Sequence, residues 1–241
     1  MKDLEIYNDT EDLINALAKT VCKAAKEAIA TNGRFNFVLS GGNSPRKLYK
    51  KLASKPYKDQ IEWKKTYFFF GDERFVPSDD PQRNSLMAKE VLFEPLKIED
   101  SHIFLVDTTS SPEDAASKYA ASIKNHFQNQ PVLFDFILLG LGDNSHTASL
   151  FPYTSVLDDT EATIRSVFVE EVDMYRITMT APLINQAKEI AFLVFGKDKS
   201  KAVFEVLEGK SGTSAQYPAR LIDLDSCKVA WFLDTEAASE L

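Results

Sequence analysis

One histidine stands in a polar cluster that directly follows an apolar run. The stretch GLGDNSHTASLFP, residues 140–152, places Asp143, Asn144 and Thr147 around His146. Histidine is the side chain that takes up and returns a proton near neutral pH. We therefore interpret His146 as a candidate general base, and the apolar residues after it predict that it lies near the start of a helix. The other two histidines, His102 and His126, are expected to be structural.

A glycine pair follows an earlier apolar run, in the stretch LSGGNSP. Glycine lets the backbone approach a ligand without a Cβ in the way, and the N–H groups that open the next helix favour phosphate. We expect that helix to have Ser44 as its N-cap and Pro45 at its first position. The stretch lacks the ending of a Walker loop, and an ordinary strand-to-helix turn is the alternative. The candidate phosphate-binding residues are Ser40, Gly41, Gly42, Asn43 and Ser44.

Charged residues follow three other apolar runs. Asp72 and Arg74 come directly after the run that ends at Phe70, where a solvated loop with an internal ion pair is the alternative interpretation. The arginine fork matches the oxygens of carboxylate and phosphate groups. Arg176 and Lys199 also stand at the edges of apolar runs. Each of these two residues alone is typical of a surface charge. Only its occurrence together with the other polar residues at the ends of apolar runs suggests an anion site.

The elements that must position these residues alternate between apolar strands and helices. Continuous apolar strands between helices predict an α/β fold: one doubly wound, mostly parallel, Rossmann-like sheet with helices on both faces, in a single domain spanning 1–241. Ligands of such folds bind beyond the carboxyl ends of the strands, so we expect His146 and the glycine pair to open onto one cleft. Strands are expected within 34–40, 65–74, 102–106, 133–142, 165–172, 176–185 and 189–196, helices within 9–33, 41–52, 83–93, 111–127 and 197–209, and a last strand and short helix within 228–241.

Composition limits the classes of partner. The chain has 241 residues and a formal net charge of −8, which argues against general nucleic-acid binding but not against one small anionic ligand. The two cysteines, Cys22 and Cys227, have no metal-binding spacing, so we expect reduced thiols and no structural zinc. The N-terminus lacks the apolar core of a signal peptide, and no run is long enough to span a membrane. We therefore expect a cytoplasmic protein with no membrane partner.

The motifs in their order along the chain resemble the 6-phosphogluconolactonase family, which is related to the glucosamine-6-phosphate deaminases. The matching pieces are LSGGNSP, FFGDERFVP followed by Asn84, GLGDNSHTASLFP, RITMTAPLINQA, VFGKDKSKA, YPARLI and WFLDTEAA. The resemblance implies hydrolysis of 6-phospho-D-glucono-1,5-lactone in the oxidative pentose phosphate pathway, with no cofactor and no metal. It also implies that the glycine loop holds the sugar phosphate, with Arg176 and Lys199 as basic partners and His146 as the catalytic histidine.

The sequence departs from the family pattern directly before the histidine. That pattern is usually Gly-x-Gly-x-Asp-Gly-His, whereas this chain has Asn144 and Ser145 in place of the Asp-Gly pair. Either Asp143 takes over the orienting role through a shifted turn, or Asn144 keeps the hydrogen bond without the charge. Loss of a carboxylate beside the ring would lower the pKa of the histidine.

The expected mechanism is general-base catalysis by His146 on a water that attacks C1 of the lactone. Arg74 or backbone amides would stabilise the oxyanion, and Asp72 is a candidate to hold the water or a sugar hydroxyl. Ser149 is interpreted as a helix-packing residue, because no nucleophile elbow is present. Two alternatives stay open: a glucosamine-6-phosphate deaminase, although SLFP replaces the FNEP-like ending of those enzymes, and a non-catalytic sugar-phosphate binder. We expect a monomer or weak homo-oligomer.

Overall fold

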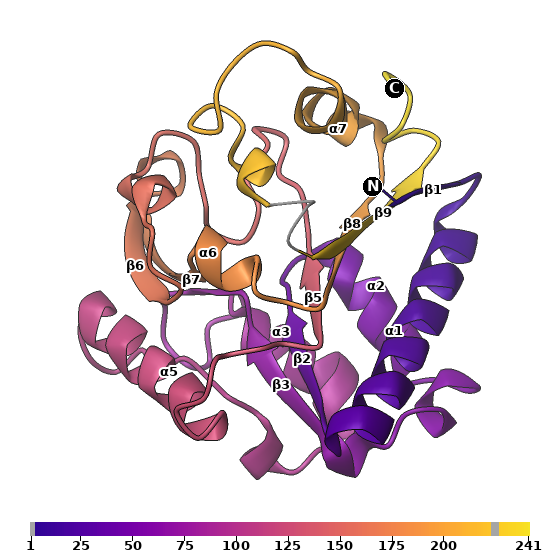
Figure 1. Cartoon of the computed structure of the whole chain (residues 1–241), viewed down its shortest axis with the longest axis vertical. Helices are drawn as coiled ribbons and strands as arrows, with labels where there is room; N and C mark the ends of the chain where they lie inside the picture. Colours follow the sequence, from indigo (N-terminus) through magenta and orange to yellow (C-terminus); the bar gives the residue numbers. More distant parts are fainter. Residues whose placement is uncertain (1–2, 223–226) are drawn as a thin grey trace.

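The main sheet contains six strands, and every neighbouring pair within it is parallel. The computed structural model describes residues 3–222 and 227–241, and within them the strand order is β1-β9-β8-β5-β2-β3 (Figure 1). The fold class predicted from the sequence is thereby confirmed, whereas a single domain over the whole chain stays a prediction. The strands are β1 (Asp3–Tyr7), β2 (Phe35–Leu39), β3 (Thr66–Phe70), β5 (Phe136–Leu139), β8 (Glu189–Val194) and β9 (Lys228–Asp234).

A second, antiparallel sheet of three strands lies against the main one. Its order is β4-β7-β6, and β7 pairs with both of its neighbours. The charged residues after β3 are therefore part of a strand rather than a solvated loop. The strands are β4 (Asp72–Arg74), β6 (Ile164–Val169) and β7 (Met174–Met179).

Both faces of the main sheet are covered, and successive residues of a strand point to opposite faces. In β2, Phe37 packs with the core cluster that contains the long first helix, and Val38 packs with the cluster that contains α5. In Figure 1, α1 and α2 lie to the right of the main sheet, and α5, α6 and the small sheet lie to the left. The α-helices are α1 (Thr10–Asn32), α2 (Asn43–Leu52), α3 (Asn84–Ala88), α4 (Glu94–Leu96), α5 (Pro112–His126), α6 (Ala181–Ile184) and α7 (Ser200–Leu207).

Shorter helical segments connect these elements. A π-helical turn, η3 (Lys89–Phe93), joins α3 to α4, so the predicted helix over 83–93 is present. None of the helices among the described residues is long and apolar enough to cross a membrane. The 3₁₀ segments are η1 (Tyr57–Asp59), η2 (Trp63–Lys65), η4 (Asp100–His102), η5 (Ser155–Asp158), η6 (Glu170–Val172), η7 (Lys197–Lys199) and η8 (Pro218–Leu221).

The two helices expected within 9–33 and 111–127 are present, and residues at the limits of these ranges cap them. Asp9 accepts a hydrogen bond from the backbone N–H of Asp12, and Gly33 ends α1 in the left-handed conformation. Ser111 caps α5, with Pro112 in the first turn. Such caps satisfy the backbone groups that have no partner inside a helix.

Several secondary-structure elements predicted from the sequence are wrong, and one strand was not predicted. Residues 102–106 form only an isolated bridge from Ile103 to Phe68, because the chain leaves the sheet edge after one pair. Residues 235–241 form turns instead of a short helix, and β1 is an edge strand that the sequence analysis missed. No helix follows His146 directly, because residues 147–153 form a bridge and turns.

The chain reverses its direction of winding between β2 and β5. These two strands are hydrogen-bonded neighbours, but the chain leaves β2 towards β3 on one side and leaves β5 towards β8 on the other. The loops after β2 and β5 therefore diverge above their carboxyl ends, and such a switch point opens a crevice in α/β sheets. The glycine pair and the His146 cluster are the two loops in question.

Candidate active site

A cleft of about 640 Å³ lies at this switch point, a size typical of small-molecule sites. The loops after β2, β5 and β8 line it together with residues of β4 and β7. Two of the predicted site residues, Asp143 and Asn144, lie outside the lining. The cleft brings together all the others: Ser40, Gly41, Gly42, Asn43, Ser44, Asp72, Arg74, His146, Arg176 and Lys199.

The glycine loop and the first turn of α2 line the cleft. The helix begins two residues earlier than the sequence analysis expects, because Gly42 is the N-cap, with φ 96°, and Ser44 lies within the first turn. The amides of Asn43 and Ser44 belong to that turn, so no helix carbonyl is available to them. Tyr49 holds the start of the loop in place, because its hydroxyl accepts a hydrogen bond from the N–H of Ser40 and donates one to the carbonyl of Ser40, both at 2.8 Å.

The ring of His146 is held on three sides. Its Nδ1 lies 2.6 Å from Asn144 Oδ1, and the ring stacks on Phe151 with centroids 3.9 Å apart. Gly142 lies against the ring, because a Cβ there would stand 2.1 Å from His146 Nδ1. Since His146 lines the cleft and Nδ1 is engaged, Nε2 is the nitrogen available to a substrate.

Burial sets the protonation of this ring. Desolvation lowers the pKa of His146 from 6.5 to about 4, against the opposing effect of the Asp72 carboxylate. Lys199 and Arg176 lower the pKa further, and Asp143 raises it. The imidazole is therefore neutral at pH 7, the form in which a general base must start.

Asn144, and not Asp143, contacts the imidazole. The amide oxygen of Asn144 also accepts a hydrogen bond from the backbone N–H of His146 at 3.1 Å. Asp143 is exposed and accepts from the backbone N–H of Asn144 at 3.0 Å. The amide nitrogen of Asn144 in turn donates to Glu171 Oε2 at 2.7 Å. Of the two alternatives, the structure therefore has the hydrogen bond without the charge.

Asp72 lines the cleft, is buried, and forms hydrogen bonds with two neighbours. Its Oδ2 accepts from the hydroxyl of Ser149 at 2.7 Å, and Asn84 Nδ2 donates to its backbone carbonyl at 2.9 Å. The interpretation of Ser149 as a helix-packing residue is wrong, because this serine lies in a turn and lines the cleft. Asp72 also acts electrostatically on His146, as its effect on the histidine pKa indicates.

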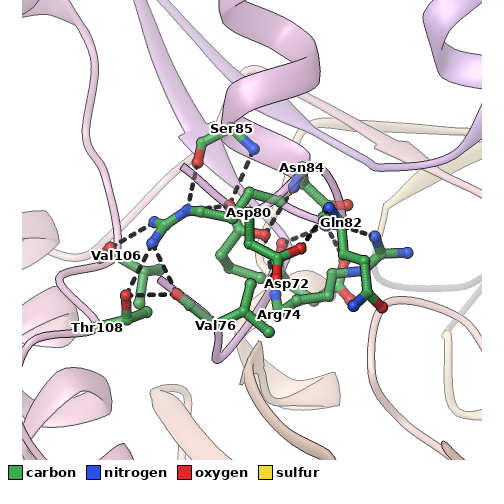
Figure 2. A network of polar contacts seen from close by, with 11 residues as sticks. Asp72, Arg74, Val76, Asp80, Gln82, Asn84, Ser85, Val106 and Thr108 are labelled. Carbon is green, nitrogen blue, oxygen red and sulfur yellow. Dashed lines mark hydrogen bonds and ion pairs between the residues drawn. The ribbon is translucent and has the colours of Figure 1, made fainter. Parts of the chain in front are cut away.

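A buried ion pair positions the Asp72 and Asn84 segments. Glu73 and Arg83 are 1% and 4% exposed in their side chains, with Oε2 and Nε 3.7 Å apart. Glu73 accepts from the backbone N–H groups of Asn84 and Ser85 at 2.8 and 2.9 Å. Figure 2 shows the surrounding network, in which Ser85, Val106 and Thr108 also accept hydrogen bonds from the Arg83 guanidinium. The start of α3 is thus fixed against β4.

Two arginines stand side by side in the cleft. Arg74 on β4 is the register partner of Arg176 on β7, and like charges directly opposite each other destabilise a sheet. The Nε atoms of both, and Oδ1 of Asn84, are buried without a hydrogen-bond partner among the described residues. Burial lowers the pKa of Arg176, and Asp72 opposes the shift. Unpaired buried polar atoms of this kind fit a site that receives a polar, anionic ligand.

Sequence reasoning did not assign a site role to Asn84, Ser149 or Glu171. Asn84 and Ser149 lie 12 and 77 residues from Asp72 in the chain, and Glu171 lies 27 residues from Asn144. The motif SLFP contained Ser149, but its contact depends on how the turn after His146 folds. No sequence signal marks Glu171, which stands in an acidic stretch between two strands.

Comparison with known proteins gives consistent results. A family model described as "Glucosamine-6-phosphate isomerases/6-phosphogluconolactonase" matches residues 8–231. A 6-phosphogluconolactonase of a Nostoc species is 35% identical, with 100% of this chain and 98% of that protein covered. One from a Synechocystis species is 35% identical, with 99% and 98% covered. The solved structure of 6-phosphogluconolactonase from Trypanosoma cruzi superposes with a TM-score of 0.86 at 26% identity, covering 100% of this chain and 97% of that one.

Proposed function

Because the chain belongs to the family of glucosamine-6-phosphate isomerases and 6-phosphogluconolactonases, we propose that it hydrolyses 6-phospho-D-glucono-1,5-lactone to 6-phosphogluconate. The observation that carries the proposal is the meeting of a neutral histidine and two adjacent arginines in one cleft. The histidine suits proton transfer, and the arginines suit an anionic substrate. The SLFP ending and the resemblance to curated lactonases favour this reaction over deamination.

The sugar phosphate is assigned to the glycine loop. The N–H groups of Asn43 and Ser44 and the positive end of the α2 dipole favour a phosphate dianion. Arg176 and Lys199 line the same cleft and supply positive charge. Binding the phosphate at a distance from the reacting carbon orients the lactone and converts binding energy into rate.

The chemical step is assigned to His146. Its Nε2 removes a proton from a water, which attacks C1 of the lactone and forms a tetrahedral oxyanion. Arg74 is the candidate to stabilise that charge, and buried Asp72 is the candidate to hold the water or a sugar hydroxyl. The C1–O bond of the ring then breaks, and the imidazolium returns its proton to the leaving ring oxygen. The reaction consumes only water and calls for no cofactor.

A direct lactonase assay tests the proposal. Fresh 6-phosphogluconolactone is supplied to wild type and to His146→Ala, and the spontaneous hydrolysis rate is subtracted. We expect kcat to fall at least about 100-fold in the variant, the scale of general acid–base catalysis, while 6-phosphogluconate still binds. Absence of wild-type hydrolysis together with ligand-dependent stabilisation would favour the non-catalytic binder instead. Ammonia release from glucosamine 6-phosphate would favour the deaminase.

The setting of the activity is also part of the proposal. We place the enzyme in the cytoplasm, where the two cysteines would stay reduced, and expect a monomer or a weak homo-oligomer. A sedimentation measurement at micromolar concentration tests the oligomeric state. A tight dimer would contradict it.

A further inference from the structure

The side chain of Asn144 links His146 to a carboxylate from a distant part of the chain. Its Oδ1 faces the histidine, 2.6 Å from Nδ1 and 3.1 Å from the backbone N–H. Its Nδ2 donates to Glu171 Oε2 at 2.7 Å. Glu171 stands in η6, the turn between β6 and β7, and lines the cleft. The three side chains therefore form one chain of hydrogen bonds.

The groups at the two ends of this chain of hydrogen bonds determine which way the amide of Asn144 points. A carboxylate only accepts hydrogen bonds, so the nitrogen of the amide must face Glu171. A backbone N–H only donates, so the oxygen must face His146. That oxygen can only accept from the ring, and Nδ1 of His146 must therefore carry the proton. Nε2 is left with its lone pair, the state that a general base requires.

The amide cannot by itself assist the charge that forms on the ring. When His146 takes a proton it becomes an imidazolium, and a neutral amide offers it a dipole but no opposite charge. Glu171 supplies a full negative charge one hydrogen bond further away. Hydrogen bonds in such a chain polarise one another, so the Glu171 carboxylate makes Asn144 Oδ1 a stronger acceptor for the hydrogen bond from the ring.

We propose that Glu171 is a positioning residue for the proposed lactonase reaction, acting through Asn144 to hold His146 as the Nδ1–H tautomer and to stabilise its protonated form. This inference rests on the proposed function, because it assigns His146 the role of base. In this role Glu171 acts through Asn144 and not on the reacting atoms. The charged groups that shift the pKa of His146 are Asp72, Lys199, Asp143 and Arg176, and they stay unchanged in the variants below; Glu171 is not one of them and is linked to the ring through Asn144.

The first test is a kinetic double-mutant cycle between positions 144 and 171. In the wild-type background, Glu171→Gln keeps an acceptor for Asn144 but removes the charge. We expect kcat to fall about tenfold with KM within about twofold, which is the scale known for residues that hold a functional side chain through a hydrogen bond. Asn144→Asp places a carboxylate 2.7 Å from Glu171, where the wild type has a hydrogen bond. Two such carboxylates repel each other and one takes up a proton.

The same Glu171→Gln substitution therefore has the opposite effect in the Asn144→Asp background. There it relieves the repulsion and offers an amide donor to the new carboxylate, so we expect kcat to rise. A residue that only maintains the fold would lower kcat in both backgrounds. Equal signs in the two backgrounds would overturn the proposal. Glu170→Gln is the matched control, because this adjacent glutamate is also exposed and is absent from the described lining of the cleft.

The second test does not depend on lactonase activity. Nitrogen-15 NMR of the imidazole distinguishes the two tautomers, and His146→Gln assigns the signal among the three histidines. We expect the Nδ1–H form in wild type and a lower population of it in Glu171→Met, which cannot accept a hydrogen bond from Asn144. A wild-type ring protonated at Nε2, or an unchanged population in Glu171→Met, would overturn the proposal. If wild type lacks lactonase activity, the proposed function fails and this readout still decides the linkage.

Discussion

The acid titration of His146 provides a quantitative test of the site. Burial lowers its pKa from 6.5 to about 4, although the Asp72 carboxylate opposes the shift. At pH 5.5 a histidine with an unperturbed pKa of about 6.5 is only ~9% neutral, whereas one with a pKa near 4 is ~97% neutral. The fraction of the free protein in the base form therefore differs about tenfold at this pH between the two cases.

The titration is best followed by NMR of the imidazole in the ligand-free protein. The substrate phosphate itself titrates at about pH 6, so a plot of kcat/KM against pH would mix the two ionisations. Two variants test the sign of the surrounding charges. Asp72→Asn should move the midpoint lower, because it removes an anion, and Lys199→Met should move it higher, because it removes a cation.

A wild-type midpoint at pH 6 or above would refute the argument that burial dominates the environment of this ring. A higher midpoint in Asp72→Asn would refute the electrostatic coupling. The shift also predicts the pH dependence of stability. The folded-state pKa of His146 lies below its unfolded value, so the unfolded chain binds the proton first. The free energy of unfolding should therefore fall as the pH drops from about 6.5 towards 4.

Three further predictions concern residues that line the cleft or support its loops. Arg176→Ala should raise KM with little change in kcat, and an unchanged KM in steady-state assays would remove Arg176 from the phosphate site. Tyr49→Phe removes the partner of both backbone groups of buried Ser40, so urea unfolding should show a loss of about 1–3 kcal/mol, and an unaltered midpoint would contradict this. Gly142→Ala places a Cβ against the His146 ring, so kcat should fall and the melting temperature should drop; a fully active variant would show that the ring moves aside freely.

Much of the fold could be predicted because its signals are local. Apolar runs alternating with helices predicted a mostly parallel sheet, and Asp9, Gly33 and Ser111 marked helix ends through hydrogen bonds within a few residues. Edge elements were less predictable. Strand β1 has exposed Leu4 and Ile6, and its pairing with β9 depends on contacts from the other end of the chain.

The antiparallel sheet could not be assigned from the sequence for the same reason. Residues 72–74 have the composition of a charged loop, yet they form β4 because β7 offers them a partner about a hundred residues later. That pairing places Arg74 opposite Arg176. Neither arginine alone is distinguishable from a surface charge in the sequence.

The sequence by itself determined the candidate base, the glycine loop and the buried strands β2, β3, β5, β8 and β9 of the main sheet, because residue type and short spacing carry that information. Only the tertiary structure decided that His146 and Gly41 face one cleft, since this depends on β5 pairing with β2 where the winding reverses. It also decided that Asn144 Oδ1 contacts the ring and that the Asn144 amide donates to Glu171. Hydrogen-bond partners in a folded chain are chosen by proximity in space, which sequence separation does not record.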